Sequence, residues 1–342
     1  MNARTVVFSM AGLGVLTASC AGMRLPSVPN SPHELGRAVG TASREAKSSS
    51  DCSKLDTEIG VQEEYALGGS VAINWAQRGG GLMIGDEAGR KLHQYLNVVG
   101  RNLASQSPRP TLQWTFGVLQ NVESFDAVSA PGGYVFVTRG LLQGVDNEAQ
   151  LAGVLAHEIA HITSKHALKR YGQVKVAQCK RAAMFKGGSD IFRQSGGDLT
   201  PSAVDTLLQA VEQGSGGRLD LDRHPDLLGK FTDDVLDSIV DNGFGAEDEY
   251  QADELAVRLM VSAGYDPGEY IRFLGKISES RSGFDNHPRK SDRVKRLVAL
   301  LKKAQDSGED FPELPADTAG LAKPTLPAEF SVVKSAVASD KR

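Results

Sequence analysis

Apolar residues recur with two different periods along this chain. Residues 86–105 have helical spacing, and residues 149–170 form a longer, more apolar run that we interpret as one helix. Between them the period changes to two, which predicts a half-buried strand at 112–118 and further short strands at 125–130 and 134–138. More helices are predicted at 55–75, 203–211, 231–240, 249–262 and in a last segment that ends at Lys303. This order predicts a mainly helical α+β fold with a small β-sheet just before the 149–170 helix.

The 149–170 helix contains the sequence HEIAH at 157–161. Four residues on an α-helix make slightly more than one turn and rise about 6 Å, so His157 and His161 share one face. That separation suits two imidazoles that bind one zinc ion. Glu158 lies beside them and can take a proton from a water molecule that zinc has acidified.

The surroundings of this motif indicate a buried helix. Asp146 is the expected N-cap, and Gly172 is the expected stop signal. The histidines have apolar neighbours, namely Val154, Leu155, Ile159 and Ile162. An exposed amphipathic helix with two unrelated histidines is the alternative, but buried histidines and a buried glutamate need partners. We therefore interpret the motif as a zinc site.

Composition limits the partners and the domain organisation. The 342 residues are 40% hydrophobic and 6% aromatic, with a net charge of −4 and no basic stripe, which argues against nucleic acid as a partner. We expect one catalytic domain at 54–304 and a flexible C-terminal tail at 305–342. Within the domain, residues 172–246 form a helical insert that either covers the cleft as a lid or completes the core.

The N-terminus resembles an export signal. Residues 1–20 contain a short apolar core, Val6–Leu16, and end in LTASC, which resembles a bacterial lipobox with Cys20 as the lipidated residue. An ordinary secretory signal is the alternative. Residues 21–53 form a polar, proline-containing tether, so we expect an exported, periplasmic protein that a lipid anchor holds at the outer membrane. Cys52 and Cys179 either form a disulfide or stay as free thiols.

Four motifs in order make the chain resemble the M48 family of zinc metallopeptidases, in its exported bacterial branch. The resemblance covers Lys54 to Leu301. Its motifs are PGGYVFVTRGLL at 131–142, HEIAH at 157–161, EYQAD at 249–253 and HP at 287–288. One departure is Asp126-Ala127, where the family usually has Asn-Ala. The resemblance implies a zincin-like, gluzincin arrangement with one Zn²⁺ per chain.

A zinc site with two histidines lacks a third protein ligand. The candidates are His166, His224, His287 and the carboxylates of 247–254. If the helix continues, His166 points away from the metal face and forms a hydrogen bond within the fold. Site logic and the resemblance together favour Glu249 as the ligand. Asp253 lies one turn later and would hold the other nitrogen of a histidine. A solvated acidic helix start is the alternative for both residues.

The resemblance also implies two further site residues. His287 would lie beside the zinc, where it donates to the oxyanion of the tetrahedral intermediate or serves as an extra ligand. Arg293 would assist it. The alternative is a loop histidine before a helix.

The strand at 134–138 is predicted to bind substrate. Gly132 and Gly133 carry no side chain, so another backbone can approach, and Tyr134, Val135 and Phe136 would offer an unpaired edge to an extended polypeptide. We therefore expect a zinc metalloendopeptidase that cleaves unfolded or misassembled cell-envelope proteins, with Glu158 as general base. The alternative is a zinc-containing chaperone or assembly factor with little proteolytic activity.

Overall fold

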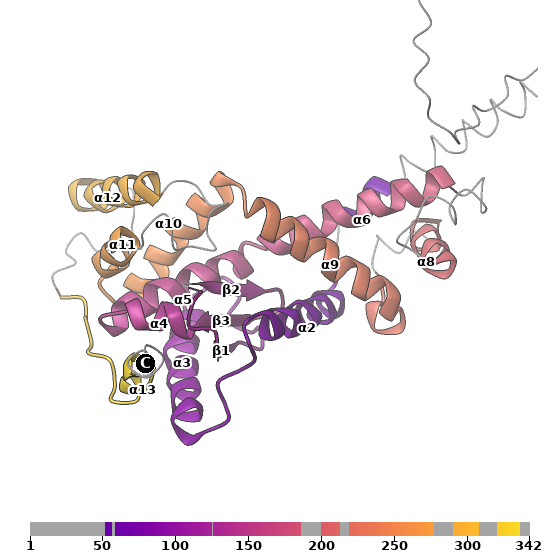
Figure 1. Ribbon diagram of the computed structural model, residues 1–342. Coiled ribbons are helices and arrows are strands. Elements are labelled where there is room, and N and C mark those ends of the chain that lie inside the picture. Colours follow the sequence, from indigo (N-terminus) through magenta and orange to yellow (C-terminus); the bar gives the residue numbers. More distant parts are fainter. Residues whose placement is uncertain are drawn as a thin grey trace, which may run out of the picture. The chain divides into compact units, whose positions relative to one another are not determined.

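The computed structural model describes residues 52–56, 59–124, 126–185, 200–212, 219–276, 290–307 and 320–335. Helices dominate this part of the chain, and a small sheet lies among them (Figure 1). The N-terminal half contains η1 (Cys52–Asp56), α2 (Val61–Arg78), α3 (Glu87–Ser105), β1 (Thr115–Leu119), β2 (Ala127–Ala130), β3 (Tyr134–Thr138), α4 (Arg139–Gly144) and α5 (Glu148–Thr163). The rest contains α6 (His166–Phe185), α8 (Pro201–Glu212), η2 (Leu221–Arg223), α9 (Pro225–Asn242), α10 (Ala246–Ser262), α11 (Pro267–Lys276), α12 (Lys290–Ser307) and α13 (Phe330–Ser335). The mainly helical fold with a small sheet is as predicted.

The sheet in the described residues has three strands in the order β1-β3-β2. β1 is parallel to β3, with Phe116 opposite Val135, and β2 is antiparallel to β3, with Val128 opposite Phe136. The prediction of a half-buried strand is wrong for β1, in which only Thr115 is exposed. The reason is that helices cover both faces of the sheet, with α2 on one side and α3 and α5 on the other (Figure 1).

The first hydrophobic core lies between the sheet, α3, α5, α10 and α11. Helix α3 has the predicted span, because Asp86 caps it by accepting the Gly89 N–H at 2.6 Å. Its leucines are fully buried against β1 and α5: Leu92, Leu96 and Leu103. This core fixes the sheet against the helix that carries the HEIAH motif.

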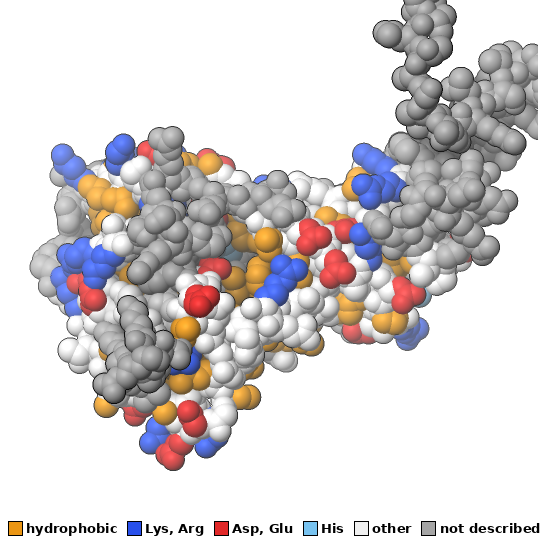
Figure 2. Space-filling model, viewed as in Figure 1, with side chains coloured by type: hydrophobic (Ala, Val, Ile, Leu, Met, Phe, Trp, Pro, Cys, Tyr) orange, Lys and Arg blue, Asp and Glu red, His pale blue; other side chains and the backbone are white. Residues whose placement is uncertain are grey.

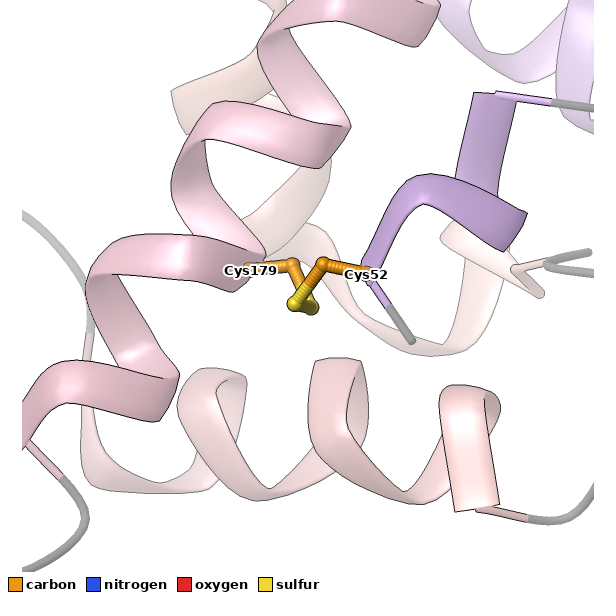
Figure 3. Close-up of a disulfide and its surroundings, with 2 residues drawn as sticks. All are labelled: Cys52 and Cys179. Carbon is orange, nitrogen blue, oxygen red and sulfur yellow. A yellow bond between two sulfur atoms is a disulfide. The ribbon is translucent and has the colours of Figure 1, made fainter. Parts of the chain in front are cut away.

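A second core joins α2, the other face of the sheet, and the predicted insert. Helices α6 and α9 pack side by side, and Tyr171 and Phe231 meet edge-on within this core, 5.3 Å between ring centres. The described helices of the predicted insert thus contribute buried residues to this core. Figure 3 shows a disulfide between Cys52 and Cys179, with Cα atoms 5.7 Å apart, so the two cysteines are paired rather than free.

Part of the C-terminal segment is folded, so the prediction of a flexible tail is wrong for residues 320–335. The backbone of Ala322 pairs with Tyr265, and the Pro324 carbonyl accepts the Glu148 N–H at 2.9 Å. Helix α13 then packs on α4, with Phe330 and Val333 buried. Few apolar residues suffice because the segment pairs through its backbone. None of the helices in the described ranges is long and apolar enough to span a membrane.

Candidate metal centre

Helix α5 carries the motif and is buried along almost its whole length. It packs against α10 and α11 on one side and against β2 on another. A close approach at Gly153 positions it, because a Cβ atom there would come within 2.5 Å of the Tyr270 side chain on α11. The N-cap is Asn147, which accepts the Gln150 N–H at 2.9 Å, and not Asp146 as predicted.

The single helix predicted at 149–170 is wrong at its C-terminal end. Helix α5 stops at Thr163, Lys165 adopts a left-handed backbone with φ of 60°, and α6 starts at His166 and continues past the predicted stop at Gly172. This break brings His166 back to the motif, and its Nδ1 lies 2.9 Å from Nδ1 of His161. His166 therefore forms a hydrogen bond within the fold from a second helix.

Three buried side chains converge at the centre of the site. Nε2 of His157 lies 3.0 Å from Nε2 of His161, and each lies 3.5 Å from a carboxylate oxygen of Glu249 on α10. Zinc binds histidine nitrogen and carboxylate oxygen at about 2.0–2.2 Å, which places two ligand atoms of a tetrahedral site about 3.3 Å apart. The distances and the donor chemistry therefore fit a zinc ion held by two histidines and one carboxylate.

Asp253 connects this group to a buried polar network. Its Oδ1 lies 3.1 Å from Nδ1 of His157, and Arg293 donates to its two oxygens at 2.7 and 2.8 Å. Tyr270 donates its hydroxyl to Oδ1 at 2.9 Å. Burial alone would raise the pKa of Asp253, but the charge and hydrogen bonds of Arg293 outweigh this effect and hold the pKa well below its usual range.

The same network sets the protonation of His157. Burial and the positive charge of Arg293 both lower its pKa, but hydrogen bonds to Asp253 and Glu249 outweigh them and raise the pKa to about 9. Because a metal ligand must be deprotonated at the binding nitrogen, metal would displace this proton. With Nδ1 facing Asp253, Nε2 faces the other two ligands.

A second network supports His161. His166 links Nδ1 of His161 to Oε1 of Gln251, the latter contact being 3.1 Å. The ring of Phe244 stacks on His161 at 4.3 Å between centres. Burial lowers the pKa of His166. Sequence reasoning missed Tyr270, Gln251 and Phe244 as neighbours of the site, because their contacts depend on how α10 and α11 pack.

Glu158 lies between the ligands on α5 and lines a cavity of about 250 Å³ together with His161 and Asp126. Asp126 is the residue directly before β2. Burial, followed by the negative charge of Glu158, raises the pKa of Asp126 to about 7. The departure from the family pattern at Asp126 therefore places a second carboxylate beside the predicted general base.

The predicted substrate edge at Tyr134, Val135 and Phe136 is wrong. These residues belong to β3, the central strand, whose two edges are paired with β1 and β2. Gly132 and Gly133 form the preceding turn with φ of 82° and 102°, and the Gly132 N–H donates to Glu64 at 3.1 Å. The glycines thus serve the turn, and the outer edge next to α5 belongs to β2. Two further predicted residues, His287 and Cys20, lie outside the described residues.

Comparison with known proteins adds the family. The sequence model for peptidase family M48 matches residues 90–301, which contain both histidines and Glu249. The chain belongs to peptidase family M48. Its helix α2 precedes the region that the M48 match covers.

The curated relatives of the chain are distant. The chain is 24% identical to the beta-barrel assembly-enhancing protease of Escherichia coli (strain K12) over 255 residues, which cover 71% of this chain and 46% of that protein. It is 24% identical to the protein of the same name in Yersinia pestis, over 55% of this chain and 33% of that protein. It is 22% identical to the mitochondrial metalloendopeptidase OMA1 of Schizosaccharomyces pombe, over 62% of this chain and 53% of that protein. The chain thus spans about half or less of the length of these relatives.

Proposed function

We propose that this chain is a zinc-dependent endopeptidase with a zincin-like, gluzincin site. The observation that carries the proposal is the buried group of His157, His161 and Glu249, at distances that fit zinc, with Glu158 beside it in a member of family M48. In this proposal the three residues hold the zinc ion, and Glu158 is the general base.

Each residue of the site has a defined task in the proposed reaction. Zinc, when bound, supplies a Lewis acid that activates water and polarises the scissile carbonyl. The Glu158 carboxylate accepts a proton from the attacking water and passes it to the leaving amine. Asp253 and Arg293 keep His157 oriented through its Nδ1. His287 supplies the donor for the oxyanion.

Substrate binding is assigned to the outer edge of β2. The Asp126 carbonyl accepts the Thr138 N–H, and this pairing alternates along the antiparallel strands. The backbone groups of Ala127 and Ser129 therefore face away from β3. An extended polypeptide that pairs there is held through its main chain, with weak dependence on side chains. Such binding favours unfolded substrates, because folded proteins do not offer an extended segment.

The cellular setting is proposed from two sources. The N-terminal signal and its lipobox-like end at Cys20 support export and a lipid anchor at the outer membrane. The relatives named beta-barrel assembly-enhancing protease support a role in the cell envelope. We therefore infer that the substrates are unfolded or misassembled envelope proteins. The name of these relatives also supports an assembly factor with little proteolysis as the second candidate, which Glu158 argues against because a pure binder needs no base.

One experiment tests the proposal and separates the two candidates. Purified protein is analysed for zinc and is incubated with casein, with and without a chelator. We expect about one zinc per chain and chelator-sensitive cleavage. Glu158→Gln, which spares all three ligands, should keep zinc and lose at least about a hundredfold in cleavage rate. A zinc-loaded protein whose cleavage is equal in Glu158→Gln would refute the mechanism, and zinc without any cleavage would favour the assembly factor.

A further inference from the structure

Part of the lining of the cavity beside the metal centre has no role in the proposed reaction. The cavity is bounded by β2 and α5, by α2, and by the C-terminal end of α9 with the residues that follow it. Its apolar lining consists of Trp75, Val128, Ile239, Val240 and Phe244. Figure 2 shows a group of hydrophobic side chains near the middle of the molecular face that is turned towards the viewer. The catalytic proposal uses Glu158 from this cavity but gives no role to the α2 and α9 side chains.

The size of the cavity suits a side chain rather than ordered water alone. Its volume is about 250 Å³. An apolar cavity of about 150 Å³ already holds a benzene-sized ligand, whereas one water occupies about 30 Å³ in the liquid. The cavity therefore has room for a leucine or phenylalanine side chain in contact with the apolar lining.

The charges around the cavity select against acidic groups. Asp126 and Glu158 both line it, and a third carboxylate next to two others is disfavoured. Arg78 also lines the cavity, but its side chain is exposed and lies over the Trp75 ring, 6.0 Å from the ring centre. Solvent screens such an exposed charge more than it screens the two carboxylates.

The position of the cavity relates it to the scissile bond. It shares Glu158 and His161 with the metal centre, and it shares Ala127 and Ser129 with the β2 edge. A polypeptide that pairs with β2 and presents a carbonyl to the metal centre places a neighbouring side chain at this cavity. The walls opposite β2 and α5 come from α2, which lies outside the M48 match, and from α9 in the insert.

We propose that the cavity between α2, α9 and β2 is the subsite for the substrate side chain next to the scissile bond, and that it takes a large apolar residue. This inference rests on the proposed function, and it names the substrate class as polypeptides that expose large apolar residues. Such residues are buried in folded proteins and exposed in unfolded ones. The insert thus contributes to specificity as well as to the core.

Two peptide series test the subsite. Quenched fluorogenic peptides with one cleavable bond carry Phe, Ala or Glu at the residue before that bond, or at the residue after it. We expect that at one of the two positions kcat/KM for Phe exceeds that for Ala by at least about tenfold, and that Glu is the poorest. Equal kcat/KM values for Phe and Ala at both positions would overturn the subsite while leaving the peptidase itself intact.

A matched pair of variants assigns the preference to the cavity. Val240→Trp fills the cavity from a side chain that is 43% exposed, and Val298→Trp makes the same change on α12 at a valine that is 50% exposed. We expect the Phe-to-Ala ratio of kcat/KM to fall at least about tenfold in Val240→Trp and to stay unchanged in Val298→Trp. The ratio does not depend on the fraction of folded enzyme. An unchanged ratio in Val240→Trp would show that another surface selects the side chain.

A binding measurement separates failure of the subsite from failure of the proposed function. The same peptides are titrated against zinc-loaded Glu158→Gln, in which binding does not require turnover. We expect the Phe peptide to bind at least about tenfold more tightly than the Ala peptide. If no peptide is cleaved by the unmodified protein but this preference persists, the peptidase proposal fails, and what stands is a site that binds large apolar side chains. Equal Kd values would refute the subsite in either case.

Discussion

The ion pair between Arg293 and Asp253 offers a quantitative test of how the metal centre is held. We consider Arg293→Met, which keeps most of the side-chain volume and removes the charge. Both side chains are 3% exposed, and the guanidinium donates to the carboxylate at 2.7 and 2.8 Å. Loss of one partner of a buried ion pair costs about 3–5 kcal/mol. Asp253 keeps two contacts, to Tyr270 at 2.9 Å and to His157 at 3.1 Å. We therefore expect Arg293→Met to lower the free energy of unfolding by about 3 kcal/mol, at the lower end of this range.

The stability loss in Arg293→Met should depend on pH. The pKa of Asp253 is depressed in the folded protein, so its contribution to the free energy of unfolding is present above the unfolded pKa of about 3.9 and is lost as the pH falls through the folded pKa. Without Arg293 the buried carboxylate binds a proton more readily. The difference between wild type and Arg293→Met should therefore be largest near pH 7 and smaller in acid.

Urea unfolding of the metal-free protein, with a chelator present, measures this difference at pH 7 and at pH 4. The matched control is Arg272→Met, because Arg272 is 53% exposed and pairs with Glu269, so its loss should cost less than about 1 kcal/mol. The double variant Arg293→Met with Asp253→Leu should recover part of the stability, since the Asp253 charge is removed together with its partner, while Glu249, which lies 3.6 Å from Arg293, still loses that contact. The reasoning is refuted if Arg293→Met costs no more than Arg272→Met, or if its cost grows towards acid pH.

Four further predictions address the metal, its support, the anchor and the disulfide. Glu249→Ala should lose both zinc and proteolysis, and full zinc content by elemental analysis would mean that another residue is the third ligand. His166→Leu should weaken zinc affinity about ten- to a hundredfold in a chelator competition, and His166→Asn should weaken it less because the amide oxygen can still accept from His161; equal losses would exclude the orienting role. Cys20→Ala should abolish labelling by a radioactive fatty acid, and persistent labelling would contradict lipidation at this residue. Replacing Cys52 and Cys179 by serine should lower the free energy of unfolding by about 2–5 kcal/mol, because the bridge joins residues 127 positions apart, and an unchanged urea midpoint would contradict this.

Local signals predicted those elements that local interactions determine. Helix α3 begins after Asp86 as expected, because its cap forms within four residues. Strand β3 has the predicted bounds, 134–138, since the turn before it and its apolar alternation are both local. The clustering of His157 and His161 follows from helical geometry alone. Glu249 lies about ninety residues further along the chain. Its contact with these histidines could be predicted only from the number of ligands that zinc needs and from the family resemblance.

Features that depend on non-local packing could not be predicted from the sequence. Four polar residues, 163–166, lie at the junction of α5 and α6, but no glycine or proline there marks the turn at Lys165. The segment at 320–335 has little periodicity and folds through backbone pairing with Tyr265 and through the burial of Phe330. Tyr270 reaches the site where α11 meets the HEIAH helix, and Gln251 reaches it where α10 meets His166 on α6. No spacing along the chain encodes such contacts.

The sheet shows most clearly how topology changes a functional interpretation. Two glycines followed by four apolar or aromatic residues and a threonine look like an exposed edge that can pair with another backbone, and the strand itself was predicted correctly. Strand order, however, depends on which partners close on each side, and β1 and β2 both pair with β3. The free edge moves by one strand, to the segment that begins beside Asp126, the position where this chain departs from the family pattern. In the proposed function, main-chain recognition of substrate at this edge lies next to a carboxylate and an apolar cavity, so side-chain selection and backbone pairing would act on the same few residues of the substrate.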